Sequence, residues 1–434
     1  IKKFIDNPKN SILIALSLSI LTGLFFWITS DVPPYGWPGN ELSDVSWGLL
    51  SDIAGKWRTL EFSLWDNAGG GMSLYTSGFY PLLFPLNFVA WFLTNDQFFL
   101  FHLVAPYAVG FFFGCLLLKE IFQLRWPYVF FGAFYYMGLA VGRLFLLANG
   151  PYYLWGCALL PAMLYAYYKI KETNGVRACA AVGVILAWQF AAAGVGQFQQ
   201  SLIWWMIFLF VENFWNVRSK NLSRTVKKWV LYSAVLVGMN TAIFGLQFIP
   251  TVLFVINESA RLPWYYPLNN FPIFPLDLPA AEWGPLNQRH VLSLLLHDAF
   301  IDSTGASMRG VVALILVAVV LWVMNPKKAF QVPGALMIRM LWITTLLYCA
   351  LPTAVEWTVN LLPELKNIVG PFFTKFTLGY GIHVWDLCTA VTLAVILNNP
   401  ALKITEVVSS RQKVLSSIFL GLAAIREIRA EPAF

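Results

Sequence analysis

The residues best suited to chemistry lie in a polar, aromatic segment from position 31 to 78. This segment contains only two cations but six carboxylates, which are Asp31, Glu41, Asp44, Asp52, Glu61 and Asp66. Asp44 and Asp52 are eight residues apart, about two helical turns, so a helix would place both on roughly the same side. A carboxylate at a membrane surface can act as a general base toward a hydroxyl, or coordinate a divalent cation bridging a diphosphate. We therefore expect a carboxylate site here that admits a divalent cation as cofactor.

Aromatic residues accompany these acids. Trp47 and Trp57 flank them and offer flat apolar faces to a sugar ring or a lipid chain. Alternatively, the acids are simply solvated and the tryptophans belong to the aromatic belt at a membrane surface. The sequence alone leaves both interpretations open.

Two further polar residues stand in apolar surroundings. Arg143 lies near the outer end of the stretch YYMGLAVGRLFLLANG, where a cation is costly and is a candidate for function. It either holds the phosphate of a lipid-linked donor or snorkels to the interface. Gln197 falls with two other glutamines in AGVGQFQQS, which predicts an outer turn between two spans. These amides either bind sugar hydroxyls or satisfy a helix end.

The histidines complete the set of candidates. The remaining polar candidates are His102, His290, His297, His383 and Asp386. Four scattered histidines indicate a metal site only weakly, although they could also ligate a tetrapyrrole. The chain contains no G-x-x-x-x-G-K-[ST], G-x-S-x-G or H-E-x-x-H, so the sequence does not support an ATPase, a serine hydrolase or a zincin.

Membrane-spanning helices are expected to position these residues. The chain is 58% hydrophobic and 12% charged, with a mean hydropathy of +0.65, whereas about 25% of residues are charged in soluble proteins. Repeated apolar runs long enough to cross a bilayer predict an all-α polytopic membrane protein, a single membrane domain of residues 1–434. The predicted spans are residues 11–30, 97–118, 127–147, 151–168, 178–194, 201–216, 229–256, 309–325, 337–355 and 372–396. The first span shows no signal-peptide cleavage site, so we expect it to be retained.

The basic residues predict the orientation of these spans. With both termini cytoplasmic, the cytoplasmic segments hold 21 of the 29 basic residues and 7 of the 22 acids. Two large outer loops result, residues 31–96 with interfacial helices and residues 257–308, and residues 397–434 form a cytoplasmic tail. Residues 79–94 are broken by Pro81 and Pro85 and are expected to be interfacial or re-entrant. The positive charge is thus a topology signal, and no nucleic-acid partner is expected.

The five cysteines are expected to act as small buried hydrophobic residues. They lie in or beside apolar runs without a CxxC pair, so neither a disulfide framework nor a zinc site is implied.

Three segments together resemble the YfhO-like bacterial membrane proteins, which look like members of the GT-C superfamily of polyprenyl-linked glycosyltransferases. The first is Asp44 followed by SLWDNAGGGMSLYTSGFYPLLFPLNF, a Gly-rich stretch that leads into Tyr-Pro and an apolar run. The second is LQFIPTVLFVINESAR, which ends at Arg261. The third and loosest is GPFFTKFTLGYGIHVWDL.

The resemblance implies a GT-C-like fold of about ten transmembrane helices in the inner (cytoplasmic) membrane of a bacterium. Its first outer loop would carry the catalytic carboxylate, best matched by Asp44. The donor would be a polyprenyl-phosphate-linked sugar, and the acceptor a cell-envelope glycan, glycolipid or protein. Arg143 and Arg261 would hold the donor phosphate. The other residues expected to bind substrate are Asp52, Trp47, Trp57, His290 and Gln197.

A second interpretation comes from a different functional class. The chain could be a non-enzymatic membrane subunit of a larger complex, with its 17% aromatic residues serving packing, lipid or pigment contacts. Its partners would then be membrane lipids and other membrane subunits. A transporter or flippase is less favoured, because Asp386 is almost alone at mid-membrane.

Overall fold

The computed structural model describes residues 8–29, 47–61, 65–66, 72–73, 82–137, 152–215, 222–259, 334–362 and 382–398. The secondary structure of these residues is helical, apart from a two-residue antiparallel ladder between β1 (Trp65–Asp66) and β2 (Met72–Ser73). The all-α prediction is therefore confirmed for the described part of the chain. The chain divides into two compact units, residues 1–261 and 262–434, and each is described by itself.

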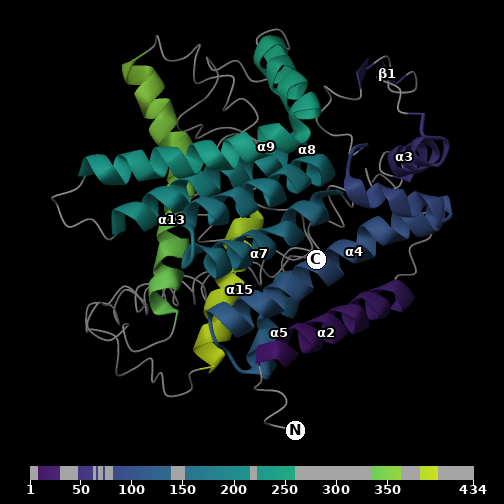
Figure 1. Cartoon of the computed structure of the whole chain (residues 1–434), viewed down its shortest axis with the longest axis horizontal. Helices are drawn as coiled ribbons and strands as arrows, with labels where there is room; N and C mark the ends of the chain where they lie inside the picture. Colours follow the sequence, from purple (N-terminus) through teal and green to yellow (C-terminus); the bar gives the residue numbers. More distant parts are fainter. Residues whose placement is uncertain are drawn as a thin grey trace, which may run out of the picture. The chain divides into compact units, whose positions relative to one another are not determined.

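The first unit is a bundle of long helices (Figure 1). Helix α4 packs on α7, α7 on α8 and α8 on α9, while α2 and α5 pack on α4. The short elements α3 and η2 pack on each other and on α4. The bounds are α2 (Pro8–Thr29), α3 (Trp47–Thr59), η2 (Pro85–Trp91), α4 (Asn95–Leu116), η3 (Leu117–Ile121), α5 (Trp126–Phe134), α7 (Tyr152–Lys171), α8 (Gly175–Trp215) and α9 (Leu222–Ser259).

Helix α2 turns its small residues inward and its large ones outward. Ser19 donates a hydrogen bond to the carbonyl of Ala108 on α4, and a Cβ added at Gly23 would lie 3.3 Å from the Ala108 side chain. Small residues spaced four apart let membrane helices approach closely, and outward aliphatic side chains suit hydrocarbon surroundings. The inward residues are Ser11, Ala15, Ser19 and Gly23, and the exposed ones are Ile12, Leu13, Leu16, Ile20, Leu21 and Leu24.

Helix α8 has helical backbone over 41 residues and yet folds back on itself. The Gln189 amide donates a 2.9 Å hydrogen bond to the Ser201 hydroxyl, and the rings of Phe190 and Phe198 lie 5.2 Å apart. In a straight helix, twelve residues would rise about 18 Å, too far for that hydrogen bond. The helix therefore reverses between Phe190 and Phe198. The expected change of direction occurs here, but the predicted non-helical turn does not.

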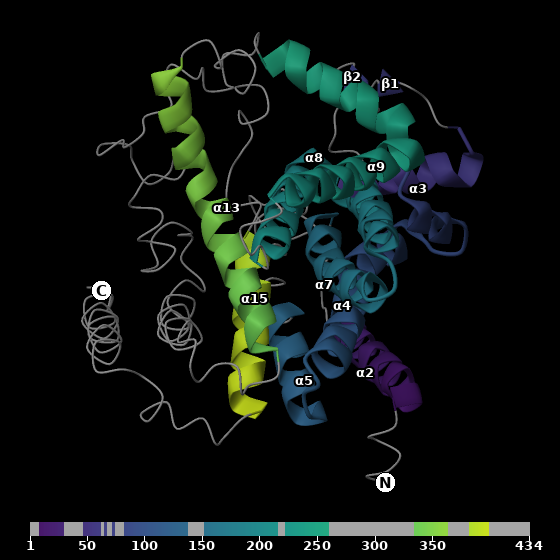
Figure 2. The ribbon, with the colours of Figure 1, turned by 60° about the vertical axis from the view of Figure 1, so that its left-hand side comes forward.

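Helix α9 is kinked at Phe244, whose φ and ψ of −120° and 25° are not helical. The part after the kink leaves the direction of the first part, as Figure 2 shows. The predicted span of residues 229–256 therefore does not correspond to one straight helix. A straight segment instead runs from Leu222 to the kink, long enough to cross about 30 Å of hydrocarbon.

The other predicted spans differ in how far the structure describes them. By length and apolar composition, Asn95–Ile121 and Gly175–Ala192 could cross a membrane, and Asn10–Leu24, Leu336–Tyr348 and Asp386–Asn398 are shorter apolar helices. Residues 85–91 form a seven-residue 310 helix, so the described part of the 79–94 stretch is not a continuous transmembrane helix. The predicted span 309–325 lies outside the described residues, as do the loop 257–308 beyond Ser259 and the tail 397–434 beyond Asn398.

The second unit contains α13 (Ala335–Leu361) and α15 (Ile382–Asn398), which pack antiparallel. Trp342 donates a 2.9 Å hydrogen bond to the Thr392 hydroxyl, and the Thr345 hydroxyl lies 3.2 Å from the Cys388 sulfur. Four of the five cysteines, Cys115, Cys157, Cys179 and Cys388, are free and buried, which confirms their predicted character.

Candidate functional site

Two short elements of the first outer loop form a fixed unit at the start of α4. The guanidinium of Arg58, on α3, donates to the carbonyls of Ala90 (2.9 Å) and Leu93 (2.7 Å) and to the side-chain oxygen of Asn95 (2.7 Å). A planar guanidinium presents its donors in a rigid fork, which suits this role better than a lysine would. Arg58 therefore ties α3 to the end of η2 and the start of α4. We call α3 and η2, so joined, the outer module.

Tryptophan side chains reinforce the outer module. The indole of Trp57 donates to the carbonyl of Leu82 (2.8 Å), and that of Trp91 donates back to the carbonyl of Trp57 (2.5 Å). The two rings meet edge to face at 6.3 Å. The apolar face of α3 (Leu50, Ile53 and Ala54) is fully buried. The predicted amphipathic helix thus exists, and its tryptophan is a structural anchor.

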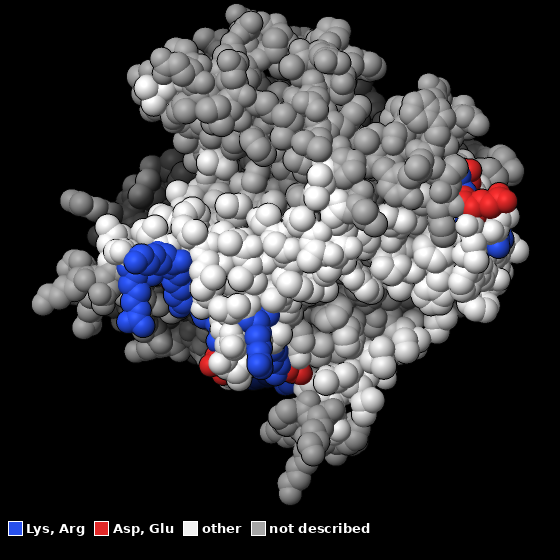
Figure 3. Space-filling view, turned by 45° about the horizontal axis from the view of Figure 1, so that its top comes forward, with Lys and Arg blue, Asp and Glu red and all other residues white. Residues whose placement is uncertain are grey.

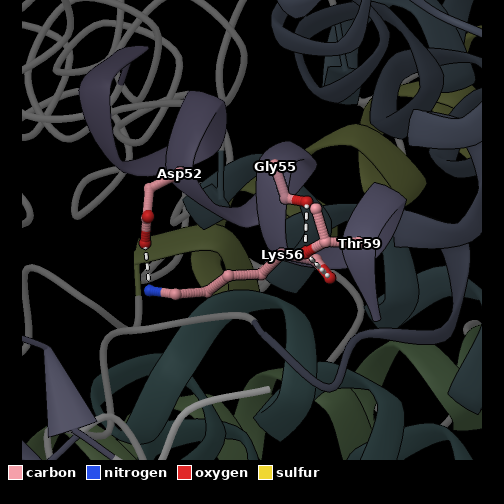
Figure 4. A network of polar contacts seen from close by, with 4 residues as sticks. All are labelled: Asp52, Gly55, Lys56 and Thr59. Atoms are coloured by element: carbon pink, nitrogen blue, oxygen red, sulfur yellow. Dashed lines mark hydrogen bonds and ion pairs between the residues drawn. The ribbon is translucent and has the colours of Figure 1, made fainter. Parts of the chain in front are cut away.

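Asp52 lies on the opposite, exposed face of α3. Its carboxylate forms an ion pair with Lys56 one turn later (Figure 4). The Thr59 hydroxyl hydrogen-bonds to the carbonyl of Gly55 in the same turn. An exposed pair of this spacing contributes about 0.3–0.5 kcal/mol. These surroundings favour the interpretation that Asp52 is a solvated surface acid.

Phe84, just before η2, connects the outer module to the bundle. Its ring lies 4.9 Å from Trp155 at the start of α7 and 6.1 Å from His102 on α4. Phe84 and Trp155 belong to a buried cluster with Ala191 and Ala192 of α8, against which Trp188 and Phe244 pack. The α8 bend and the α9 kink therefore lie at the same end of the bundle as the outer module. We call this end the aromatic end.

Hydrogen bonds converge on one turn of α7, Trp155 to Cys157, at the aromatic end. The Trp155 indole donates to His102 Nδ1 (3.0 Å), and the Gln189 amide donates to the carbonyl of Gly156 (2.8 Å). The Tyr136 hydroxyl donates to the carbonyl of Cys157 (2.8 Å), and the Gln197 amide lies 3.7 Å from its sulfur. Residues from α4, from α8 and from just after α5 thus meet around this turn of α7. We use the name polar belt for this turn together with the four side chains that meet it, His102, Tyr136, Gln189 and Gln197.

The polar belt keeps hydrogen-bonding capacity in reserve. His102 Nε2 and the carbonyl oxygens of Gln189 and Gln197 are buried and have no hydrogen-bond partner in the part of the chain that the structure describes. Because His102 Nδ1 accepts a hydrogen bond, its proton resides on Nε2. A buried polar atom without a partner costs about 1–3 kcal/mol. One neutral donor and two neutral acceptors are thus available among aromatic rings.

The opposite end of the bundle is built from charges. Glu212 of α8 accepts hydrogen bonds from Tyr167 and Lys171 of α7, and Glu120 of η3 accepts from Tyr165 (3.1 Å) and pairs with Lys169. Each lysine follows its tyrosine by four residues and lies over that ring. The start of α8 packs against the third turn of α9 here, because a Cβ at Gly175 would collide with Tyr232. We call this end the basic end.

Half of the predicted site residues lie outside the described part of the chain. These are Asp44, Arg143, Arg261 and His290, and only the backbone of Trp47 is described, as the first residue of α3. Of the others, Asp52 and Trp57 share α3, whereas Gln197 is at the polar belt. The structure does not bring these three together into one cluster. Asp44 precedes α3 by three residues, so its predicted role as N-cap stays a prediction.

Gln197 lies at the reversal of α8, where the sequence predicted a turn between two spans. Its side chain is buried, as is that of Gln200. The reason is the reversal of α8, which turns its polar residues toward α7. Sequence reasoning also missed Gln189, Arg58 and Glu212 as organising residues. A glutamine or a glutamate inside an apolar run was the available signal for two of them.

No group of three or more potential metal ligands occurs among the described histidines, cysteines and carboxylates. Comparison with protein-family models, with curated proteins and with solved structures gives no match. The function must therefore be argued from the residues themselves.

Proposed function

We propose that this chain is a polytopic membrane glycosyltransferase of the GT-C type. It would use a polyprenyl-phosphate-linked sugar donor at the outer face of a bacterial inner membrane. The proposal includes the topology of about ten spans with both termini cytoplasmic. It rests on the resemblance of the Asp44 and Arg261 segments and on the geometry of the aromatic end.

The distribution of charge supports the membrane orientation. Among the described residues of the first unit, Lys56 and Arg58 are the cations of the outer module. Eight cations lie on η3, just before α5, or at the ends of α7, α8 and α9 that form the basic end. They are Lys119, Arg125, Lys169, Lys171, Arg177, Arg224, Lys227 and Lys228. In the view of Figure 3, charged side chains gather at two separate places, with uncharged residues between them. A cytoplasmic basic end and an outward aromatic end follow from the positive-inside rule.

One observation carries the functional proposal. The segment directly after Asp44 folds into the outer module, and Phe84 seats that module on the aromatic cluster beside the polar belt. Exposed aromatic residues of the module, Phe88, Trp91 and Phe92, are suited to the headgroup level of a bilayer. Because Asp44 precedes α3 by three residues in the sequence, we propose that it acts at the level where a lipid-linked sugar would present its anomeric carbon.

The proposed reaction is an inverting sugar transfer. Asp44 accepts the proton of an acceptor hydroxyl, whose oxygen bonds to the anomeric carbon of the donor from the side opposite the phosphate. The bond between that carbon and the phosphate oxygen breaks, and polyprenyl phosphate leaves with the electron pair. The configuration at the anomeric carbon is therefore inverted. Arg143 and Arg261 hold the leaving phosphate through charge-assisted hydrogen bonds.

Replacement of Asp44 tests this mechanism. Asp44→Asn keeps the size of the side chain and removes its charge. We expect a loss of transfer of about 100-fold or more, measured with purified protein in liposomes and a panel of polyprenyl-phosphate sugars. The matched control is Glu61→Gln, an exposed acid just after α3, which should transfer sugar at the normal rate. Normal transfer by Asp44→Asn would exclude Asp44 from the mechanism.

One observation favours the second candidate, a non-enzymatic membrane subunit. Four side chains of α3 with charged or indole groups are committed to structure: Asp52 pairs with Lys56, and Trp57 and Arg58 bind backbone carbonyls. Absence of transfer by the unmutated protein with every donor in the panel would favour this candidate over the enzyme.

A further inference from the structure

The basic end carries a group of cations that the fold does not use. Arg177 lies in the first turn of α8, and Arg224, Lys227 and Lys228 lie in the first turns of α9. The start of α8 at Gly175 packs against Tyr232 in the third turn of α9, and Lys228 lies over the Tyr232 ring at 5.1 Å. We call these four residues the cationic face.

The nearby carboxylates do not neutralise this face. Glu120 is bound by Lys169 and Glu212 by Lys171. Arg177, Arg224 and Lys227 are exposed, and the structure gives them no ion-pair partner in the part of the chain that it describes. Glu172, on the turn before α8, is the other described acid at this end. Near the four cations of the cationic face, Glu172 is therefore the one described carboxylate that is not already paired with a lysine.

Helix stability does not explain these cations. The first turns of α8 and α9 contain no acidic residue. The positive end of a helix dipole disfavours a cation by a few tenths of a kcal/mol. Arg177 and Arg224 therefore weaken the helices they begin, unless an anion accompanies them.

The surface beside the cationic face shows what kind of anion fits. On the same turns of α9, the side chains of Leu222, Val226, Val230 and Leu231 are exposed, with exposed fractions of 57%, 39%, 52% and 51%. At 3.6 residues per turn, Leu231 lies on the same side of α9 as Arg224, Lys227 and Lys228, and Leu222, Val226 and Val230 form the adjoining exposed side. The indole of Trp229 is fixed to the carbonyl of Met206 (3.0 Å) at the same level. A ligand that covers this surface needs an anionic head and an apolar body.

We propose that the cationic face binds the phosphate head groups of anionic phospholipids, with their acyl chains along the start of α9. This inference rests on the proposed membrane location and not on the proposed reaction. Basic residues at a membrane surface attract anionic lipid, and each contributes enough that three together change affinity about a hundredfold.

The test compares two lipids and two sets of substitutions. The whole protein is reconstituted in nanodiscs of phosphatidylcholine, with or without phosphatidylglycerol, and the lipids retained after delipidation are counted by native mass spectrometry. The unmutated protein should retain phosphatidylglycerol in preference to phosphatidylcholine. Arg177→Gln/Arg224→Gln/Lys227→Gln should lose about a hundredfold in apparent affinity for phosphatidylglycerol. Arg177→Lys/Arg224→Lys, which keeps the charge, should retain the preference.

Folding and free phosphate are tested separately. The thermal unfolding of the triple variant in phosphatidylcholine alone should match that of the unmutated protein, so that lost lipid binding is not lost structure. Equal retention of both lipids by the unmutated protein, or an unchanged preference in the triple variant, would overturn the proposal. Displacement of the bound lipid by millimolar inorganic phosphate would also overturn it, because the site would then recognise free phosphate.

Discussion

The two ends of the first bundle differ in the charge of their buried polar groups. At the basic end, Glu212 and Glu120 each receive a lysine and a tyrosine, so their charges are compensated within the fold. At the aromatic end, the polar belt is neutral, and His102, Gln189 and Gln197 each keep an atom without a partner among the described residues. The Tyr168 hydroxyl of the basic end is likewise buried without a hydrogen-bond partner among the described residues, so unpaired atoms occur at both ends. What distinguishes the aromatic end is that three neutral groups with unpaired atoms gather around one turn of α7.

The largest effect should come from Glu212→Ala at the basic end. This substitution leaves Lys171 and the Tyr167 hydroxyl without their acceptor beside a buried position. Breaking a buried pair by removing one partner costs about 3–5 kcal/mol. Because Lys171 is partly exposed, we expect a loss of about 3 kcal/mol. The free energy of unfolding can be measured by denaturant titration in mixed micelles. Glu172→Ala, an exposed neighbour, should change it by less than about 0.5 kcal/mol. Equal effects of the two substitutions would remove the structural role of Glu212.

A smaller effect is expected from Arg58→Ala in the outer module. The substitution removes the hydrogen bonds to Ala90, Leu93 and Asn95, which are part-exposed, and we expect a loss of about 1–2 kcal/mol. The loss should be local, so amide exchange should rise in η2 and stay constant at the polar belt. Lys56→Ala breaks the ion pair with the exposed Asp52 and serves as the control, with an expected change under about 0.5 kcal/mol. Increased exchange at Trp155 in Arg58→Ala would show that the module and the belt unfold together.

The smallest expected effect, a coupling energy, and the sharpest test of the comparison come from His102 and Trp155. Trp155→Phe alone leaves His102 with two unpaired nitrogens and should cost about 1–3 kcal/mol. His102→Phe/Trp155→Phe removes both partners and should recover part of that loss, so a double-mutant cycle should show coupling of about 1 kcal/mol. If the polar belt serves function, the double variant folds and yet loses sugar transfer. Full transfer by a stable double variant would make the belt a purely structural feature.

Sequence patterns predicted the helices better than their contacts. The apolar runs 97–118 and 151–168 correspond closely to α4 (Asn95–Leu116) and α7 (Tyr152–Lys171), because hydrophobic length reports directly on a buried or lipid-facing helix. The reversal of the chain near Gln197 was also expected. Its burial was not, because hydropathy does not say which residues another helix covers.

The candidate site was less predictable for the same reason. Trp57 was read as a possible ligand surface, yet its indole is bound to Leu82, 25 residues away. The interaction of Glu212 with Tyr167 spans 45 residues and depends on the reversal of α8. No local pattern encodes such pairs. The acid that the resemblance singles out, Asp44, depends on the chain around it in the same way.

The reversal of α8 has a consequence for biogenesis. Inserted alone, the first limb would carry the Gln189 amide into hydrocarbon, and the second limb would do the same with the Ser201 hydroxyl. Each group would lack a partner there, at a cost that opposes partitioning from the translocation channel into lipid. Because Gln189 donates to Ser201, the folded-back pair satisfies both groups within itself. The two limbs should therefore leave the channel together, as one helical hairpin, before α7 and α9 close around them.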